Sequence, residues 1–469
     1  MLVSARELSI EILINIFENG VFCNTALHEC LGKWSALDNK ERAFLTLLVE
    51  GTVERRIEID YVINQYSKKP VNKLKPYIRN VLRMSVYQIM YMDKVPQSAA
   101  VNEAVKLVVK KGFGGLRGFV NGILRNISRN KDNITYPDCE SDFVDYISVK
   151  YSMPEWIVKH FMEEMTKEEV IKSMEYYLSN TDTVVRLTDR GIKQSELLEL
   201  FQKENITYRQ GNIFDFAYRL STTGRIDKLP GFLEGAFVVQ DESSMIPGYI
   251  VLNYCRKQCE KKQNISIRIM DMCAAPGGKT LHVAGMSSYP IQVDSYDISD
   301  YKVKRIADNA QRLGLHNIIA SVMDALKYNE KLREQYDVVI ADLPCSGLGV
   351  LAKKPDIKYN TNIDALDELA GIQRQMLSNA AAYTKPGGLI VYSTCTIDKQ
   401  ENEDNAKHFL HNNPDFEKCN LCDLLGDNIP ENLAKSCTDE GYIKIIPGNV
   451  QSDGFFVAAF QKKCAVDIQ

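Results

Sequence analysis

Two cysteines, Cys345 and Cys395, stand in sequence contexts that favour nucleophilic chemistry over simple packing. Cys345 lies in DLPCSGLG (342–349) and Cys395 in STCT (393–396), and each motif directly follows an apolar run that predicts a buried strand. A thiolate can attack an electrophilic carbon, form a covalent intermediate and leave again at the end of the reaction. A free cysteine is most often a small buried hydrophobe, but two cysteines at corresponding strand ends indicate a nucleophile. The pattern leaves open which of the two attacks.

A loop of small residues, MCAAPGGKT (272–280), follows another predicted strand. Small side chains let a backbone approach a ligand closely, and the N-terminus of the following helix offers unpaired N–H groups to an anion. The end of this loop is similar to a phosphate-binding P-loop, but that motif requires glycine at position 273, where the chain has cysteine. The glycines of a dinucleotide-binding loop are also misplaced. We expect the loop to hold a nucleoside cofactor through Cys273, Ala274, Ala275, Pro276, Gly277, Gly278 and Lys279.

Three aspartates, Asp297, Asp324 and Asp342, close successive predicted strands after this loop. A carboxylate at the end of the second strand can accept hydrogen bonds from both ribose hydroxyls of an adenosine. A carboxylate at the end of the third can accept one from the adenine amine. Each aspartate could instead cap a helix N-terminus, a common position for aspartate after a strand. The ordered series behind a loop of small residues favours cofactor binding.

Strands and helices alternate from about residue 265 onward, which predicts a doubly wound, Rossmann-like α/β domain over 241–463. The carboxyl ends of parallel strands meet at one edge of such a sheet. The loop, the aspartates and the cysteines are therefore expected to lie together. The predicted strands are 266–271, 291–297, 317–323, 336–342 and 388–394, and the predicted helices are 278–286, 299–313, 362–383 and 400–412.

The remaining sequence predicts two further domains, so the protein should be multidomain. Apolar residues at helical spacing predict an all-α domain over 1–131, with helices at 58–66, 73–92, 97–111 and 116–128. A polar linker then leads to a second part, 145–240, made of a helical piece and a small α+β module. Strand-like runs at 183–187 and 237–240 and a helix at 194–203 indicate that module.

The charge of the chain is distributed unevenly. The net charge is -4, but residues 1–131 carry 20 Lys and Arg against 12 Asp and Glu. A basic domain on an acidic body indicates contact with a polyanion, although a solvated lysine-rich face would have the same composition. Arg55 and Arg56, together with further basic residues from Lys106 to Arg129, are the candidates for such contact.

Composition argues against several other classes of protein. Hydrophobic residues make up 45% of the chain, yet no apolar run is long enough to span a membrane, and the first residues do not resemble a signal peptide. We therefore expect a cytoplasmic protein. The 12 cysteines are scattered, which predicts reduced thiols rather than a disulfide scaffold. The single C-x-x-C, at Cys419 and Cys422, has no second ligand pair, so no metal site is expected.

Five segments together resemble the Sun family of RNA 5-methylcytosine methyltransferases. They are VVQDESS (238–244), MCAAPGGKT (272–280), DLPCSGLG (342–349), STCT (393–396) and SDGFFVAAF (452–460). The all-α domain is similar to the antitermination factor NusB, which implies the branch that acts on small-subunit ribosomal RNA. The resemblance implies an RRM-like middle module and a class I methyltransferase domain. It also implies a monomer that transfers a methyl group from S-adenosylmethionine to carbon 5 of a cytosine in 16S ribosomal RNA.

The resemblance also implies roles for individual residues. The loop 273–279 and the three strand-end aspartates would contact S-adenosylmethionine, with Asp342 able to serve the cytosine as well. Cys395 would be the nucleophile, and Cys345 would assist release of the product. Another family segment begins with arginines and corresponds here to KKPDIKY (353–359), which makes Lys353, Lys354 and Lys358 candidate RNA contacts. Lysine keeps the charge but lacks the bidentate fork of arginine.

Two other functions remain open on the sequence. A non-catalytic RNA-binding or assembly factor would use the basic helical domain but would leave Cys345 and Cys395 without a purpose. A transfer RNA methyltransferase of the same catalytic family would share every catalytic motif. Only the NusB-like domain favours ribosomal RNA over transfer RNA.

Overall fold

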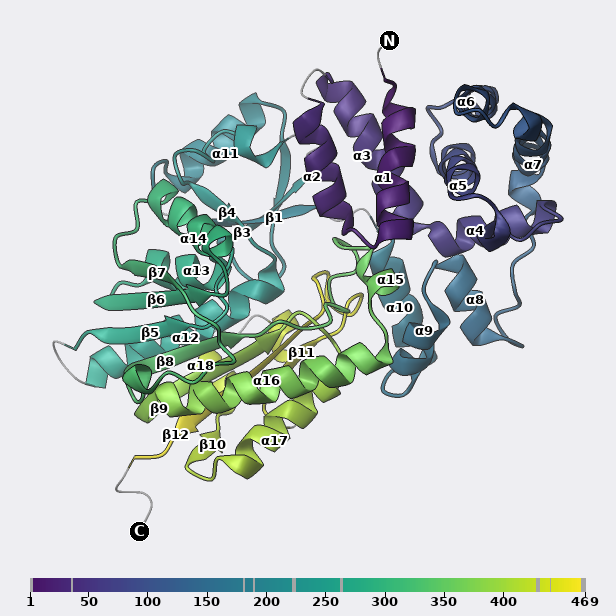
Figure 1. Ribbon diagram of the computed structural model, residues 1–469. Coiled ribbons are helices and arrows are strands. Elements are labelled where there is room, and N and C mark those ends of the chain that lie inside the picture. The colour runs from purple at the N-terminus through teal and green to yellow at the C-terminus, as the bar shows by residue number, and fades with distance from the viewer. Residues whose placement is uncertain are drawn as a thin grey trace. The chain divides into compact units, whose positions relative to one another are not determined.

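The chain folds into two compact units, and each is assembled from two separate stretches of sequence (Figure 1). The computed structural model describes residues 3–34, 37–179, 182–188, 190–221, 225–261, 265–426, 431–438 and 440–464. The first unit comprises Met1–Ser179 and Leu351–Asn362, and the second comprises Asn180–Val350 and Ile363–Gln469. The chain therefore passes between the units three times.

The first unit is helical, as its apolar spacing predicts. Its helices begin where the sequence offers caps: Asp38 and Glu41 form a reciprocal capping box, and Pro76 occupies the first turn of its helix. Their apolar faces form one core that includes Leu48 and Val81. The helices are α1 (Ala5–Asn19), α2 (Cys23–Lys33), α3 (Asn39–Glu54), α4 (Arg56–Tyr66), α5 (Pro76–Tyr91), α6 (Gln97–Lys110), α7 (Arg117–Asn130), α8 (Phe143–Lys150), α9 (Glu155–Met162), α10 (Lys167–Tyr177) and α15 (Ile357–Asn360), with short 3-10 turns η1 (Val71–Lys73), η2 (Gly114–Leu116) and η3 (Lys131–Asn133).

The boundary between the units differs from the expected division at residues 131–145. Helices α8 to α10 belong to the first unit, while the small α+β module belongs to the second. A hydrogen bond accounts for part of this grouping, since the hydroxyl of Ser152, just after α8, accepts from the backbone N–H of Ile57 in α4 at 2.8 Å.

The segment Leu351–Asn362, here called the returning segment, completes two helix ends of the first unit. The Asp356 carboxylate accepts from the backbone N–H of Cys23 at 2.7 Å, at the start of α2, where the N-cap residue Phe22 supplies no side-chain bond. The ammonium group of Lys358 donates to the carbonyl oxygen of Glu54, the last residue of α3, at 2.8 Å. Helix ends leave such groups unpaired, and both charges also have the sign that the helix dipole favours.

The second unit contains a small antiparallel sheet and one helix, which correspond to the predicted α+β module. The strands are β1 (Thr183–Leu187), β2 (Thr207–Gln210), β3 (Ala217–Ser221) and β4 (Phe237–Val239), in the order β2-β3-β1-β4. The helix is α11 (Gln194–Lys203), and η4 (Ile226–Lys228) follows β3.

The main body of the second unit is a Rossmann-like sheet with helices on its faces (Figure 1). The five predicted parallel strands are confirmed, as β5 (Ile267–Asp271), β6 (Ile291–Asp297), β7 (Ile318–Val322), β8 (Tyr336–Asp342) and β9 (Thr384–Thr394). The predicted helices are confirmed as α13 (Gly278–Met286), α14 (Asp300–Arg312), α16 (Ile363–Tyr383) and α17 (Asn405–Asn412), the last of which extends from the π-helical turn η6 (Gln400–Asp404). A 3-10 turn, η5 (Glu330–Leu332), precedes β8.

Several elements of this unit were not predicted. Antiparallel strands extend the sheet beyond β9 in the order β10-β12-β9, and β11 pairs with β12. The long helix α12 (Glu242–Lys261) contains Pro247 and Gly248, which in the sequence look like helix breakers. Gly248 permits close approach of α12 to α13, because an added Cβ would lie 2.4 Å from the His282 ring. The unpredicted elements are α12, α18 (Leu421–Leu425), α19 (Glu431–Ala434), β10 (Phe416–Lys418), β11 (Ile443–Ile445) and β12 (Phe455–Lys462).

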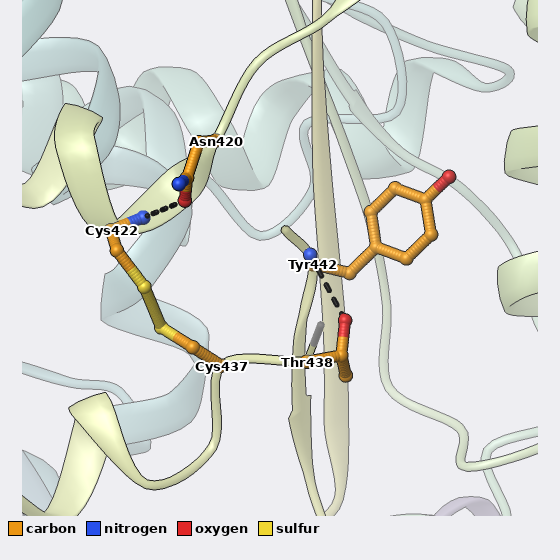
Figure 2. The surroundings of a disulfide bond; sticks show 5 residues. All are labelled: Asn420, Cys422, Cys437, Thr438 and Tyr442. Carbon is orange, nitrogen blue, oxygen red and sulfur yellow. Dashed lines mark hydrogen bonds between the residues drawn. A yellow bond between two sulfur atoms is a disulfide. The ribbon is translucent and has the colours of Figure 1, made fainter. Parts of the chain in front are cut away.

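A disulfide between Cys422 and Cys437 corrects the expectation that all cysteines are reduced (Figure 2). Asn420 accepts from the backbone N–H of Cys422 at 3.0 Å, and Thr438 accepts from that of Tyr442 at 3.1 Å, so both cysteines lie in hydrogen-bonded turns. The pairing depends on how these turns meet in the fold, which the spacing of cysteines in the sequence does not reveal. Within the described residues, Cys419 is a free thiol.

Neither a membrane span nor a metal-binding cluster occurs in the described part of the chain. None of the helices there combines the length and apolarity that crossing a bilayer requires. Similarly, no three His, Cys, Asp or Glu side chains among these residues are grouped so that they could hold a metal ion.

Candidate functional site

The residues singled out from the sequence come together at one edge of the large sheet. Strands β5 to β9 run parallel to one another (Figure 1). Asp271, Asp297, Asp342 and Thr394 each end one of these strands and therefore lie at the same edge of the sheet. Cys395 directly follows Thr394. Backbone topology alone therefore places acids and a thiol from distant parts of the sequence at a common edge.

The loop of small residues forms a tight turn into α13. Gly277 has φ +107°, a left-handed conformation that favours glycine, and it is the N-cap residue of the helix. The Asp297 carboxylate accepts from the backbone N–H of Ala275 at 3.0 Å, which ties the end of β6 to this turn. Asp297 is not a helix cap, since Ser299 caps α14. The alternative interpretation of Asp297 as a helix cap is therefore wrong.

The third aspartate in the series, Asp324, lies in the turn after β7. Its carboxylate accepts from the backbone N–H of Leu326 at 3.1 Å, and no helix begins there. Its side chain is 28% exposed, so part of the carboxylate stays open to a ligand.

Lys279 and Asp342 form an ion pair at the centre of this edge. The ammonium group lies 2.5 Å from one carboxylate oxygen, and the Ser393 hydroxyl donates to the other at 2.7 Å. Burial alone would lower the pKa of Lys279, but the Asp342 charge keeps it raised. The negative charge available to a thiolate at Cys395 raises it further. The lysine is therefore a fixed positive charge between the acid and the thiol.

Cys345 and Cys395 lie side by side, with their sulfur atoms 3.2 Å apart. The hydrogen bond to Cys395 raises the pKa of the Cys345 thiol well above its usual range, and burial and the nearby negative charges add to this effect. The loop that carries Cys345 is pinned further along, where Gly349 donates to the Cys395 carbonyl at 3.1 Å and accepts from Gly454 at 2.8 Å. An added Cβ at Gly349 would lie 2.2 Å from the Gly454 carbonyl oxygen, so this approach requires glycine.

Asp271, at the end of β5, is almost fully buried beneath the small-residue loop. One carboxylate oxygen accepts from the Thr280 hydroxyl at 2.7 Å, and the other has no hydrogen-bond partner among the described residues. Burial raises the pKa of this carboxyl to about 7. Asp324 and Asp342 are partly open acids. Together with an acceptor that has no partner and a backbone turn free of bulky side chains, they suit the amine and hydroxyl groups of a nucleoside cofactor.

Two further polar residues hold the site together, although sequence reasoning did not assign them a role. Asp241 accepts from the Ser452 hydroxyl at 2.6 Å and from the Ser243 hydroxyl at 2.8 Å. These bonds join the motifs VVQDESS and SDGFFVAAF, which lie more than 200 positions apart. The presence of Asp241 and Ser452 within recognisable motifs was the only signal that could have identified them.

The five candidate RNA-contacting cations take different positions in the first unit. The Arg56 guanidinium lies 3.7 Å from the centre of the Tyr359 ring, Arg55 pairs with Glu58, and Lys358 is buried at the end of α3. Burial lowers the pKa of Lys358 to about 7. These three side chains make contacts within the first unit, so a structural role accounts for their presence in the sequence. Lys353 and Lys354 are exposed, so they remain predicted RNA contacts.

Comparisons with known proteins agree with this architecture. Residues 260–461 match the model for the 16S rRNA methyltransferase RsmB/F family, and residues 3–129 match the NusB family. The chain is 35% identical to the probable ribosomal RNA small subunit methyltransferase B of Bacillus subtilis (strain 168), covering 98% of this chain and 99% of that one. It is 26% identical to ribosomal RNA small subunit methyltransferase B of Klebsiella pneumoniae (strain 342), with 98% and 99% covered.

Solved structures show the same fold at lower sequence identity. The crystal structure of PH0851 superposes with a TM-score of 0.77 and 23% identity, covering 98% of this chain and all of that one. NSun6 from Pyrococcus horikoshii, solved with SFG, has a TM-score of 0.54 and 18% identity, covering 66% and 98% of the two chains. The first likeness spans both units, which supports the fold described here.

Proposed function

Because the chain belongs to the RsmB/F family of 16S rRNA methyltransferases, we propose that it methylates carbon 5 of a cytosine in 16S ribosomal RNA through a covalent adduct with Cys395. Methyltransfer to ribosomal RNA is the activity of the family. The ring position, the RNA molecule and the adduct are the finer parts of the proposal. The observation that carries them is the pair of sulfur atoms 3.2 Å apart beside a lysine–aspartate ion pair.

S-adenosylmethionine is the cofactor, and when bound it supplies an electrophilic methyl group. The turn at 273–278 suits its polar end, because the N-terminus of α13 faces that turn and favours a carboxylate. Asp297 and Asp324 suit the ribose hydroxyls and the adenine amine. Asp297 already supports the turn through Ala275, so loss of its carboxylate would disturb both the turn and the ribose contact.

The electrostatics of the two thiols support Cys395 as the nucleophile. Cys345 is held as a neutral thiol, because its hydrogen bond to Cys395 and its burial both oppose ionisation. Cys395 lies beside the Cys345 thiol, and the Lys279 ammonium is close enough for the charges of Lys279 and a Cys395 thiolate to interact. A neighbouring cation and a hydrogen-bond donor both favour a thiolate.

The proposed reaction begins with attack of the Cys395 thiolate on carbon 6 of the cytosine, which makes carbon 5 nucleophilic. Asp342, held by Lys279 and Ser393, can accept from the exocyclic amine and from ring nitrogen 3, which takes up a proton as negative charge moves through the ring. After carbon 5 acquires the methyl group it loses its proton to a base, and the Cys395 sulfur leaves carbon 6 with its bonding electrons. The target base must be flipped out of its stack to reach the thiol.

The exposed face of α7 is the best-placed surface for RNA phosphates in the first unit. From residue 104 to residue 131 the chain has seven Lys and Arg and no Asp or Glu. Arg117, Arg125 and Arg129 project from the exposed side of α7, while Val120 and Leu124 on its other side are buried. Their charges are not neutralised by any ion pair in the described part of the chain. We propose that this face holds ribosomal RNA and that the protein works as a cytoplasmic monomer.

Substitution of each cysteine tests the proposal most directly. Cys395→Ala should lose methyl transfer and adduct formation, because no nucleophile remains, by roughly 10³-fold or more. Cys345→Ala should retain methyl transfer to the first RNA molecule but leave a protein–RNA adduct visible on a denaturing gel. Bisulfite sequencing of 16S ribosomal RNA and transfer RNA after incubation identifies the methylated molecule. Normal turnover by Cys395→Ala would refute the assignment of Cys395 as the nucleophile. Methylation of transfer RNA alone would show that transfer RNA, and not 16S ribosomal RNA, is the substrate.

A further inference from the structure

Glu401 is a buried carboxylate next to Cys345 that the proposed reaction does not use. Its side chain has no exposed surface, and it lies in the π-helical turn Gln400–Asp404, a few residues after Cys395. Turns of this type are rare and are frequently found at functional sites. A carboxylate without solvent is costly unless its contacts compensate for the lost hydration.

The contacts of Glu401 hold the backbone on both sides of Cys345. One carboxylate oxygen accepts from the Ser346 N–H at 2.9 Å and from the Gln373 amide at 2.8 Å. The same Gln373 amide donates to the Pro344 carbonyl at 2.9 Å. Glu401 therefore fixes the residue after Cys345 directly and the residue before it through Gln373.

The orientation of Gln373 is itself determined by hydrogen bonds. Asn405 donates to the amide oxygen of Gln373 at 2.8 Å, and the Tyr392 hydroxyl lies 3.3 Å from the same atom. The NH₂ group of Gln373 must consequently point toward Glu401 and Pro344. The partners of Gln373 therefore allow only one orientation of its amide, and a fully satisfied buried network of this kind is rigid.

The second carboxylate oxygen of Glu401 is buried and has no hydrogen-bond partner among the described residues. A neutral amide could satisfy the Ser346 N–H at a lower cost of desolvation. The negative charge also acts on the titratable groups beside it, which are Asp398 and Cys345. The charge of Glu401 opposes ionisation of that thiol, adding to the effect of the hydrogen bond that Cys345 donates to Cys395 and to burial.

We propose that Glu401 is a positioning residue for product release: it keeps Cys345 a thiol whose hydrogen points at the Cys395 sulfur as that sulfur leaves carbon 6. The hydrogen bond shares the negative charge of the departing thiolate, and the proton stays on Cys345. No redox change or additional reactant is involved. This inference rests on the proposed function, because it assumes the Cys395 adduct.

Glu401→Gln removes the charge and one acceptor while keeping the shape of the side chain. The variant should bind S-adenosylmethionine normally and accumulate the protein–RNA adduct several-fold over the unchanged enzyme, approaching Cys345→Ala. The double variant should accumulate no more than Cys345→Ala alone, because Glu401 acts through that thiol. Glu403→Gln is the matched control, since Glu403 lies in the same turn but pairs with Lys444. Adduct levels unchanged in Glu401→Gln, or additive in the double variant, would overturn the proposal.

A second measurement does not require RNA. In a Cys395→Ser background, the rate at which iodoacetamide alkylates Cys345 reports its ionisation at each pH. Glu401→Gln should lower the midpoint of this profile by roughly one pH unit, whereas a merely structural role would leave it unchanged. If Cys345→Ala formed no adduct, the proposed reaction would be wrong. The alkylation profile would still show whether the charge of Glu401 opposes ionisation of Cys345. If Glu401→Gln failed to fold, Gln373→Met should produce the adduct phenotype, and its absence would count against the inference.

Discussion

The acids at the strand ends of the second unit and the cations of the first unit were both singled out by sequence, but the structure treats them differently. Asp297 and Asp342 lie at one edge of the large sheet together with Asp271, which the sequence did not single out. All three contact the loop of small residues or its lysine. Among the cations, Lys358 and Arg56 are engaged in contacts within their own unit, while Arg117, Arg125 and Arg129 are exposed.

This difference shows how well each kind of sequence pattern predicts where a residue lies in the fold. A residue at the end of a parallel strand has its place fixed by the backbone of the sheet. A cation in a helical domain has no such constraint, because a lysine can neutralise an RNA phosphate or complete a helix end equally well. Lys358 takes the second role at the end of α3.

Among the substitutions that test this comparison, the largest effect should come from Asp342→Asn, which breaks the centre of the strand-end group. The amide cannot hold Lys279 and Ser393 through two charged oxygens, so we expect turnover to fall by roughly 10²–10³-fold. Radiolabelled methyl transfer to RNA measures the loss. Asp337→Asn is the control, because Asp337 lies at the other end of the same strand and pairs with Lys385. Equal losses in both variants would mean that strand-end position carries no special role.

A second prediction concerns the pH dependence of stability in the second unit. Burial raises the pKa of Asp271 to about 7 in the folded protein, above its value of about 3.9 in an unfolded chain. Its contribution to stability is fully present below pH 3.9 and is lost as the pH rises through 7. Asp271→Asn should remove this dependence, on the order of 2–4 kcal/mol between pH 4 and pH 8.

Hydrogen exchange at the β5 amides measures this effect in the unit concerned. Both tryptophans, Trp34 and Trp156, lie in the first unit, so their fluorescence would not report it. Parallel pH responses of the unchanged protein and Asp271→Asn would show that the carboxyl stays ionised when folded.

The smallest expected effect is on RNA affinity, and it tests which cations of the first unit contact RNA. Replacing Arg117, Arg125 and Arg129 with glutamine should weaken RNA binding by roughly tenfold and reduce the slope of log affinity against log salt by about two to three. Arg56→Ala should leave that slope unchanged and destabilise the first unit by about 1 kcal/mol, because it loses its place over the Tyr359 ring. Fluorescence anisotropy measures affinity, and Lys159→Gln serves as control. If only Arg56→Ala reduced the slope, the sequence-based assignment of Arg56 to RNA would stand.

The sequence predicted those parts of the fold and site that depend on local pattern. Strands β5 to β9 each show an apolar run that ends in a chemically useful residue, so both the sheet and the set of aspartates and cysteines could be anticipated. Helix α12 could not be anticipated, because Pro247 and Gly248 suggest a break in the helix. Only the packing of α12 against His282 explains the glycine. The pairing of Cys422 with Cys437 depends on tertiary structure.

The choice between Cys345 and Cys395 shows the same limit at the level of chemistry. Both cysteines occupy equivalent places in the sequence pattern, and only a family resemblance distinguished them. The structure adds a physical difference, since Cys345 is opposed in ionisation by its neighbours while Cys395 lies within reach of the charge of Lys279. Glu401 contributes to that difference, yet nothing in its local sequence separates it from an ordinary surface carboxylate.

The returning segment has a consequence for how the helical domain can be inherited. A gene fragment ending at residue 179 would encode every helix from α1 to α10. Its product would still lack Asp356 at the start of α2 and Lys358 at the end of α3. The first unit is therefore not encoded by one continuous stretch, because 12 of its residues are encoded inside the gene region for the other unit. Recombination that exchanged the first 179 codons would have to be followed by matching changes at 351–362.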